Sequence, residues 1–113
     1  MSAFDLSEVD RQRRQANKPY LELLRAPGLS LGLYVLPPGG TDTQGPHGED
    51  EVYHVIRGRG RFRLGEDDRA VQPGSILFAP TGEPHRFHSV TEEMHILVFF
   101  APVEGTAQAT HPR

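Results

Sequence analysis

The chain contains no cysteine among its 113 residues. Disulfide bridges and thiolate metal sites are therefore excluded, and the absence fits a reducing compartment. No apolar run approaches the ~20 residues that a membrane-spanning helix needs. The first ten residues carry neither a basic start nor an apolar run, so they predict no secretory signal peptide. We therefore expect a cytoplasmic protein with no membrane partner.

The chain also lacks an excess of basic residues. Its formal net charge is -3, which gives no reason to expect nucleic acid as a partner. The hydrophobic fraction of 36% is low but still typical of a globular protein. A chain of this length predicts one domain with a single core.

Glycine and proline, by contrast, are abundant. The 12 glycines and 10 prolines separate short segments, a pattern typical of an all-β chain. We expect strands over residues 20–25, 29–36, 51–57, 61–64, 69–72, 75–79, 84–89 and 94–101. Tight turns are expected at 58–60 and 91–93. Short strands joined in this way favour a closed barrel or a two-sheet antiparallel architecture.

The two ends of the chain carry different signals. Ser7 begins a sequence that resembles a capping box, and the residues up to about Asn17 favour a helix. Residues 102–113 show no pattern and predict a loose tail. We therefore divide the chain into a helical segment at 1–19, a β-domain at 20–101 and a tail at 102–113.

One stretch concentrates side chains that can carry chemistry. His47, Glu49 and Glu51 occur at steps of two, and side chains at such steps share one face of an extended strand. Tyr53 follows on the same face. An imidazole beside carboxylates suits a divalent metal that takes nitrogen and oxygen ligands. Glu49 is a candidate ligand or catalytic acid, unless the curvature of the loop turns it outward.

Two ordered motifs resemble those of the cupin superfamily. The first has a glutamate, six residues and a glycine, which Glu51 and Gly58 match, and a histidine four residues before the glutamate, which His47 matches. The second motif is matched by Gly74, Pro80, Gly82 and His85. The resemblance covers about residues 30–101. It implies an all-β fold, a single-domain antiparallel β-barrel or double-sheet jelly roll, here with a short N-terminal helix.

The chain departs from the family pattern at two positions. Gly45 and Ser89 stand where cupins usually have a further histidine and an asparagine. The resemblance therefore assigns roles as metal ligands to His47, Glu51 and His85 alone.

The ligand set implied by the resemblance does not select one metal. Two histidines and a carboxylate resemble the facial triad of non-haem iron sites, but the same set binds zinc, manganese or nickel. We therefore expect one divalent ion, Fe, Zn, Mn or Ni. Gln44 and Tyr53 are candidates for contacting the bound cofactor, Gln44 through its amide oxygen.

Each predicted ligand also has an ordinary structural alternative. His47 would then be a loop histidine in solvent, and His85 would be a histidine satisfied within the core. Glu51 would be an inward carboxylate bonded to a tyrosine or an arginine. His54 and His88 have the opposite strand parity to the motif residues and are expected to point outward.

The interior is expected to be aromatic. Five aromatic side chains are candidates to line an apolar pocket or to fill the core: Tyr53, Phe62, Phe78, Phe87 and Phe99. His95 has the parity of Phe99 and is expected to enter the barrel, as a core histidine bonded to a neighbour or, alternatively, as a fourth ligand.

The resemblance implies a metal-binding cupin that acts on a small molecule held in the barrel, as a dioxygenase or an isomerase. The alternative is a non-catalytic cupin that binds or senses a small ligand, because one fold hosts many chemistries.

A homodimer is also expected. Met94, Ile96, Val98 and Phe100 are expected to form an exposed apolar face of the last strand, opposite Leu97 and Phe99. A strand that is apolar on both faces needs a cover, which a second subunit or the N-terminal segment would supply.

Overall fold

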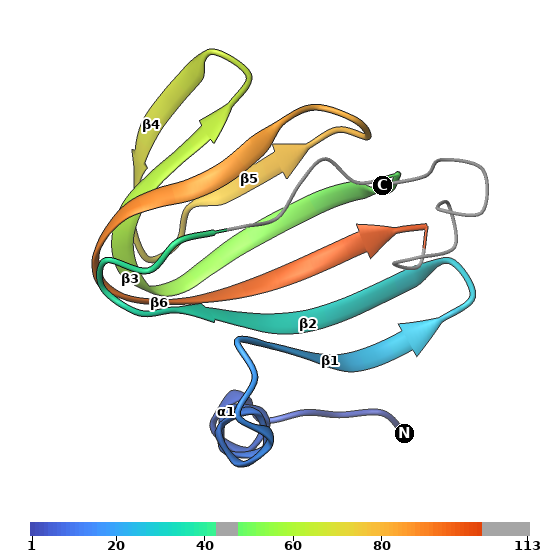
Figure 1. Cartoon of the computed structure of the whole chain (residues 1–113). Helices are drawn as coiled ribbons and strands as arrows, with labels where there is room; N and C mark the ends of the chain where they lie inside the picture. The colour runs from blue at the N-terminus through green and yellow to red at the C-terminus, as the bar shows by residue number, and fades with distance from the viewer. Residues whose placement is uncertain (43–47, 103–113) are drawn as a thin grey trace.

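The computed structural model describes residues 1–42 and 48–102 as one helix and one bent antiparallel sheet (Figure 1). The elements are α1 (Leu6–Ala16), β1 (Tyr20–Ala26), β2 (Leu29–Leu36), β3 (Asp50–Leu64), β4 (Asp67–Val71), β5 (Ile76–Ala79) and β6 (His85–Ala101). Within these residues, no helix has the length and apolar character required to cross a bilayer. The predicted all-β fold with a short N-terminal helix is confirmed.

The sheet is organised around its two longest strands. Its strand order is β1-β2-β6-β3-β4, and β5 also pairs with β3. β3 and β6 run antiparallel along almost their whole length, from the pair Asp50–Ala101 to the pair Leu64–His85. Both strands bend in the middle, so that the sheet folds over on itself (Figure 1). The bend brings the two ends of one ladder to face each other across the interior.

The two turns predicted at 58–60 and 91–93 are wrong, because both segments lie inside long strands. Gly58 has a φ of 92° and lies in a region where the register of β3 and β6 shifts repeatedly. A Cβ atom on Gly58 would come within 2.1 Å of the backbone oxygen of Glu93. The glycines therefore allow an irregular bend and a close approach of two backbones, not a reversal of the chain.

The interior face of the sheet follows a period of two. Tyr53, Val55 and Phe62 of β3 are buried in the main core, in line with the alternation of side chains along a strand. The face of β6 that carries Met94 and Ile96 also lies in this core. The expectation that this face of β6 lies outside and needs a cover is therefore wrong.

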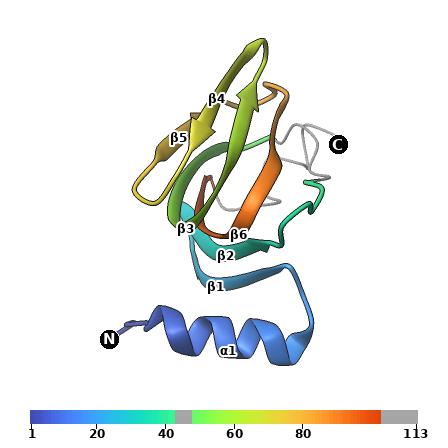
Figure 2. The same ribbon diagram turned by 90° about the vertical axis from the view of Figure 1, so that its left-hand side faces the viewer.

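Helix α1 covers part of the outer face of the sheet. Val9 packs with Leu33 and Val35 of β2 in a second apolar cluster, which Leu97 of β6 also joins. Figure 2 shows the helix lying against β1, outside the barrel. The residue that caps its N-terminus is Asp5 and not Ser7, so the predicted capping box is wrong. The C-terminus is predicted correctly, since Asn17 ends the helix in a left-handed conformation.

Candidate metal centre

A small group of polar side chains lies in the apolar interior. Glu51 and Tyr53 come from the start of β3, and His85 comes from the start of β6. Glu51 is 0% exposed and His85 is 7% exposed. In the ladder His85 pairs with Leu64, at the far end of β3 from Glu51. The bend of the sheet is therefore what brings the two predicted ligands together.

The hydrogen bonds of this group orient its donor atoms. The phenol of Tyr53 donates a short hydrogen bond to Oε2 of Glu51. Nε2 of His85 lies 3.5 Å from the same oxygen atom. Nδ1 of His85 lies 2.7 Å from the carbonyl oxygen of Glu83. A carbonyl only accepts, so Nδ1 carries a hydrogen and Nε2 faces the Glu51 carboxylate.

The electrostatics of the group favour a cation at Nε2. Burial lowers the pKa of His85, but the hydrogen bonds to Glu51 and to the Glu83 carbonyl, with the charges of Glu51 and Asp42, raise the pKa above its ordinary value. Burial and the negative charge of Glu51 also raise the pKa of Tyr53, which keeps its phenol protonated as a donor. A proton or a metal ion on Nε2 would satisfy both His85 and Glu51.

Aromatic rings surround the polar group. The Tyr53 ring lies 5.5 Å from that of Phe62 and 5.1 Å from that of Phe87, between centroids. The His85 ring lies 6.2 Å from Phe62. These rings exclude water and so strengthen the interactions among the polar groups. The prediction that Phe62, Phe87 and Tyr53 line the interior is confirmed.

Two of the five predicted interior aromatics lie elsewhere. Phe78 is 54% exposed, and it points away from the core because its neighbour Leu77 points inward. Phe99 is half-buried on the outer face of β6, next to the inward Phe100. The prediction for Phe99 is therefore wrong, since alternation identifies two faces but does not say which is inside. Phe78 lies outside the core but lines an apolar pocket, which is one of its two predicted roles.

The same reason explains a correction for His95. His95 shares its parity with Phe99 as predicted, but that parity is the outer one. Its Nε2 atom lies 2.9 Å from Oε1 of Glu93, and its ring lines a groove beside α1. His88 is confirmed as outward, and its Nε2 lies 2.8 Å from Oδ2 of Asp68.

The remaining site predictions have different outcomes. Glu49 is 1% exposed, so the loop does not turn it out into solvent. His47 and Gln44 lie outside the described residues. Within residues 1–42 and 48–102, no three or more acidic or histidine side chains gather into a set that would hold a metal ion. Two of the three predicted ligands, Glu51 and His85, are brought together.

A buried acid that the sequence reading missed supports this centre. Oδ1 of Asp42 accepts a hydrogen bond of 2.9 Å from the phenol of Tyr34. Oδ2 of Asp42 accepts another of 2.9 Å from the backbone N–H of Phe87. Asp42 thus ties the segment after β2 to β6, two residues from His85. It lies in an irregular stretch with no strand periodicity, so no pattern marked it.

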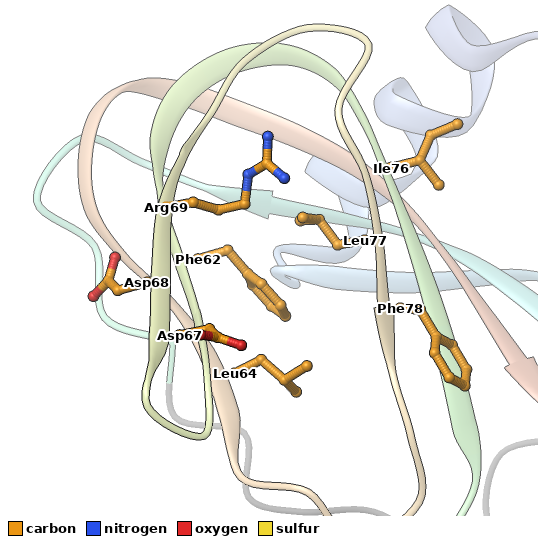
Figure 3. Close-up of a pocket in the computed structure, with 8 residues that line it drawn as sticks. All are labelled: Phe62, Leu64, Asp67, Asp68, Arg69, Ile76, Leu77 and Phe78. Carbon is orange, nitrogen blue, oxygen red and sulfur yellow. The ribbon is translucent and has the colours of Figure 1, made fainter.

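A cavity of about 600 Å³ opens beside the aromatic rings, between β4 and β5. Figure 3 shows Phe62, Leu64 and Leu77 pointing into it, with Arg69 on β4 at its margin. Phe62 lines this cavity and also packs beside the rings of Tyr53 and His85. The barrel is thus open on the side of β4 and β5.

Known proteins resemble this chain in sequence and in fold. Residues 32–100 match the model of the cupin domain family. The uncharacterized protein SCO3923 of Streptomyces coelicolor is 41% identical over 105 residues, which are 93% of this chain and 100% of that protein. The crystal structure of TT1209 from Thermus thermophilus has a TM-score of 0.72 at 29% identity and covers 90% of this chain and 98% of that chain.

An enzyme shares the same barrel at lower identity. The crystal structure of the DMSP lyase DddQ from Ruegeria pomeroyi has a TM-score of 0.68 at 22% identity, and the match covers 73% of this chain and 45% of that chain. At this identity the likeness concerns the fold alone. The family match spans more than half of the chain and contains both motifs, so the chain belongs to the cupin domain family.

Proposed function

We propose that this cupin binds one divalent metal ion inside its barrel through His47, Glu51 and His85. With that ion it acts on a small molecule, as a dioxygenase or an isomerase. The observation that carries the proposal is the buried pair of His85 and Glu51, whose donor atoms face each other in the interior. The chain position of His47, four residues before Glu51, supplies the third ligand.

The spacing of the two donors supports a shared ion. Nε2 of His85 and Oε2 of Glu51 are 3.5 Å apart. Two ligands held at about 2.0–2.2 Å from one ion, at angles of about 90–110°, lie roughly 2.8–3.6 Å from each other. An ion would therefore fit between these atoms without a large movement of either side chain.

The neighbours of the two ligands support the same conclusion. Histidines that bind a metal usually donate their other ring N–H to a carbonyl or a carboxylate, which fixes the ring. The carbonyl of Glu83 has this role for His85, and the phenol of Tyr53 holds the carboxylate of Glu51. Tyr53 is therefore proposed as an orienting residue for the metal ligand.

The chemistry divides between the ion and the protein. A bound divalent ion would polarise an oxygen atom of the small molecule or supply open coordination positions. Glu49, buried two residues before Glu51, is proposed to exchange a proton with that molecule. The rings of Phe62 and Phe87 pack against each other and against Tyr53, and they keep water from this part of the interior.

A DMSP lyase has the same barrel, so this fold can carry an enzymatic function, but the likeness does not extend to the reaction. The non-catalytic alternative uses the same ligands without turnover. It would be favoured by a stable, redox-silent complex in which the ion has no open position.

Elemental analysis of protein purified without chelator or affinity-tag nickel tests the proposal. We expect about one divalent ion per chain in the wild type and a strong loss in His85→Ala. His88→Ala is the matched control, because His88 lies on the outer face in a bond to Asp68. A wild type that takes up no metal after supplementation, or an equal loss in both variants, would contradict the proposal.

A further inference from the structure

The cavity between β4 and β5 is apolar on most of its surface but carries charge on β4. Phe62 and Leu64 of β3 and Leu77 of β5 supply apolar side chains, whereas β4 contributes Asp67 and Arg69. Its volume of about 600 Å³ lies within the ~300–1,000 Å³ that is typical of sites for small molecules. The cavity is therefore large enough for an organic molecule with an apolar body.

Arg69 lies on the inner face of β4. It pairs with Phe62 in the ladder of β3 and β4, and directly opposite residues of antiparallel strands share one face. Phe62 is 4% exposed, and Val71, two residues after Arg69 on the same face, is 2% exposed. Figure 3 shows the guanidinium group of Arg69 pointing away from Asp67. A cation thus stands beside the cavity at a position where the alternation of the strand would place an apolar side chain.

The charge of Arg69 is not balanced by a neighbouring acid. Arg69 makes no hydrogen bond or ion pair with any residue in the ranges 1–42 and 48–102. Asp68 also borders the cavity, but its two carboxylate oxygens lie 2.9 Å from Nε of Arg61 and 2.8 Å from Nε2 of His88. The guanidinium group of Arg69 is therefore open to a ligand.

We propose that this cavity binds a small carboxylate, with the charged group on Arg69 and an apolar body against Phe62 and Leu77. A guanidinium group presents its N–H donors in a planar fork that matches the two oxygens of a carboxylate. The apolar side chains around the cavity reduce the access of water and so strengthen this interaction. A neutral molecule of the same shape lacks the attraction and should bind more weakly.

The carboxylate would be the small molecule of the proposed function, and in that respect the inference rests on that function. The Phe62 ring lies 5.5 Å from the Tyr53 ring and 6.2 Å from the His85 ring, between centroids. Leu77 pairs with Tyr53 in the ladder of β3 and β5. A molecule held by Arg69 would therefore have its apolar body beside the residues that enclose the candidate metal centre. Arg69 would select that molecule by its charge.

An NMR titration of the full chain with 3-phenylpropanoate tests the inference. The matched ligand is 3-phenylpropanamide, which has nearly the same shape and no charge. We expect shifts of the backbone amides at 62–64, 67–69 and 76–78, and binding of the amide that is about tenfold weaker or more.

Two variants separate Arg69 from the overall charge of the protein. Arg69→Gln should weaken the binding of 3-phenylpropanoate by about tenfold or more, because it removes a hydrogen-bond donor to a charged group. It should leave the thermal midpoint and the binding of the amide unchanged. Arg25→Gln removes the same charge from β1, where Arg25 pairs with Glu22, and it should bind like the wild type.

Titrations of metal-free and metal-supplemented protein distinguish this inference from the proposed function. Contact with Arg69 needs no ion, so both samples should bind 3-phenylpropanoate. A chain that takes up no metal but binds the carboxylate through Arg69 would contradict the proposed function alone. A chain that takes up metal but binds the carboxylate and the amide equally, or loses nothing in Arg69→Gln, would overturn this inference alone. Absence of binding to the wild type, or an equal loss in Arg25→Gln, would overturn it as well.

Discussion

Tyr53 and Glu51 lie on the same face of β3, and the phenol of Tyr53 donates a hydrogen bond to Oε2 of Glu51. The two residues are buried together in the interior. The sequence reading included a carboxylate bonded to a tyrosine as the ordinary structural alternative for Glu51. The bond is present, but Oε2 also faces Nε2 of His85, so the bond is equally what an orienting neighbour of a metal ligand would make.

Tyr53→Phe separates these two roles. It removes one hydroxyl group and keeps the ring in place. We expect the metal affinity to fall by about 10–100-fold, as on loss of other orienting neighbours, and the free energy of unfolding to fall by about 1–3 kcal/mol. A chelator competition and a denaturant titration measure the two effects.

Tyr34→Phe is the control for this variant. Tyr34 is also buried, and its phenol donates to Asp42 instead of Glu51. It should lower stability to a similar degree and leave the metal affinity within about twofold. Equal losses of affinity in both variants would show that packing, and not the orientation of Glu51, controls the metal.

The two buried carboxylates of the motif should differ in function. Glu51→Ala should remove most of the bound metal, because Glu51 faces His85, whereas Glu49→Ala should keep the metal and lower turnover. The pair is matched, since Glu51 and Glu49 are 0% and 1% exposed. Elemental analysis of both proteins checks this. Equal or reversed losses of metal would show that Glu51 is wrongly assigned as the carboxylate ligand.

We expect the open positions of the proposed ion to depend on Gln44. Gln44→His should restore the usual fourth ligand, tighten the metal and weaken the binding of an added 2-oxo acid or catecholate. Gln44→Ala should change the metal affinity little. Calorimetric titration of the metal and absorption spectra with the added ligand measure these effects. Loss of the metal in Gln44→Ala would make Gln44 itself a ligand.

Asp42 should contribute to stability more than its place in a loop suggests. Asp42→Ala leaves the phenol of Tyr34 and the backbone N–H of Phe87 without the acceptor that each has now. We expect the free energy of unfolding to fall by about 2–5 kcal/mol, since a lost bond to a charged group costs about 1.5–3 kcal/mol. Asp42→Asn keeps one acceptor and should lose less. An unchanged denaturant midpoint in Asp42→Ala would show that Asp42 does not stabilise the fold in this way.

The bend of β3 can be tested with two glycines. Gly58→Ala should lower the free energy of unfolding by about 3 kcal/mol or more, because it adds overpacking to backbone strain. Gly74 has a similar φ of 96°, but a Cβ atom there would meet nothing within 4 Å. Gly74→Ala should therefore cost only about 1–3 kcal/mol. Equal thermal shifts in the two variants would argue against the close approach of β3 and β6.

The local features of this protein can be predicted from its amino-acid sequence alone. The two motifs identified the family, and the period of two placed Glu51 and Tyr53 on one face, because these depend on neighbours along the chain. The end of the helix at Asn17 was readable for the same reason. The strands of 29–36 and 75–79 were also predicted to within one residue of β2 and β5.

Which face of each strand lies inside, and where the sheet bends, depends on contacts between distant parts of the chain. Alternation is a local rule, and the choice between its two faces depends on strands far along the chain. Phe99 and His95 were assigned to the wrong side for this reason. The glycines near position 58 were read as a turn because their close contact with Glu93 arises from a distant strand. His85 lies close to Glu51 because of the same bend. The spacing of residues in the sequence does not predict that bend.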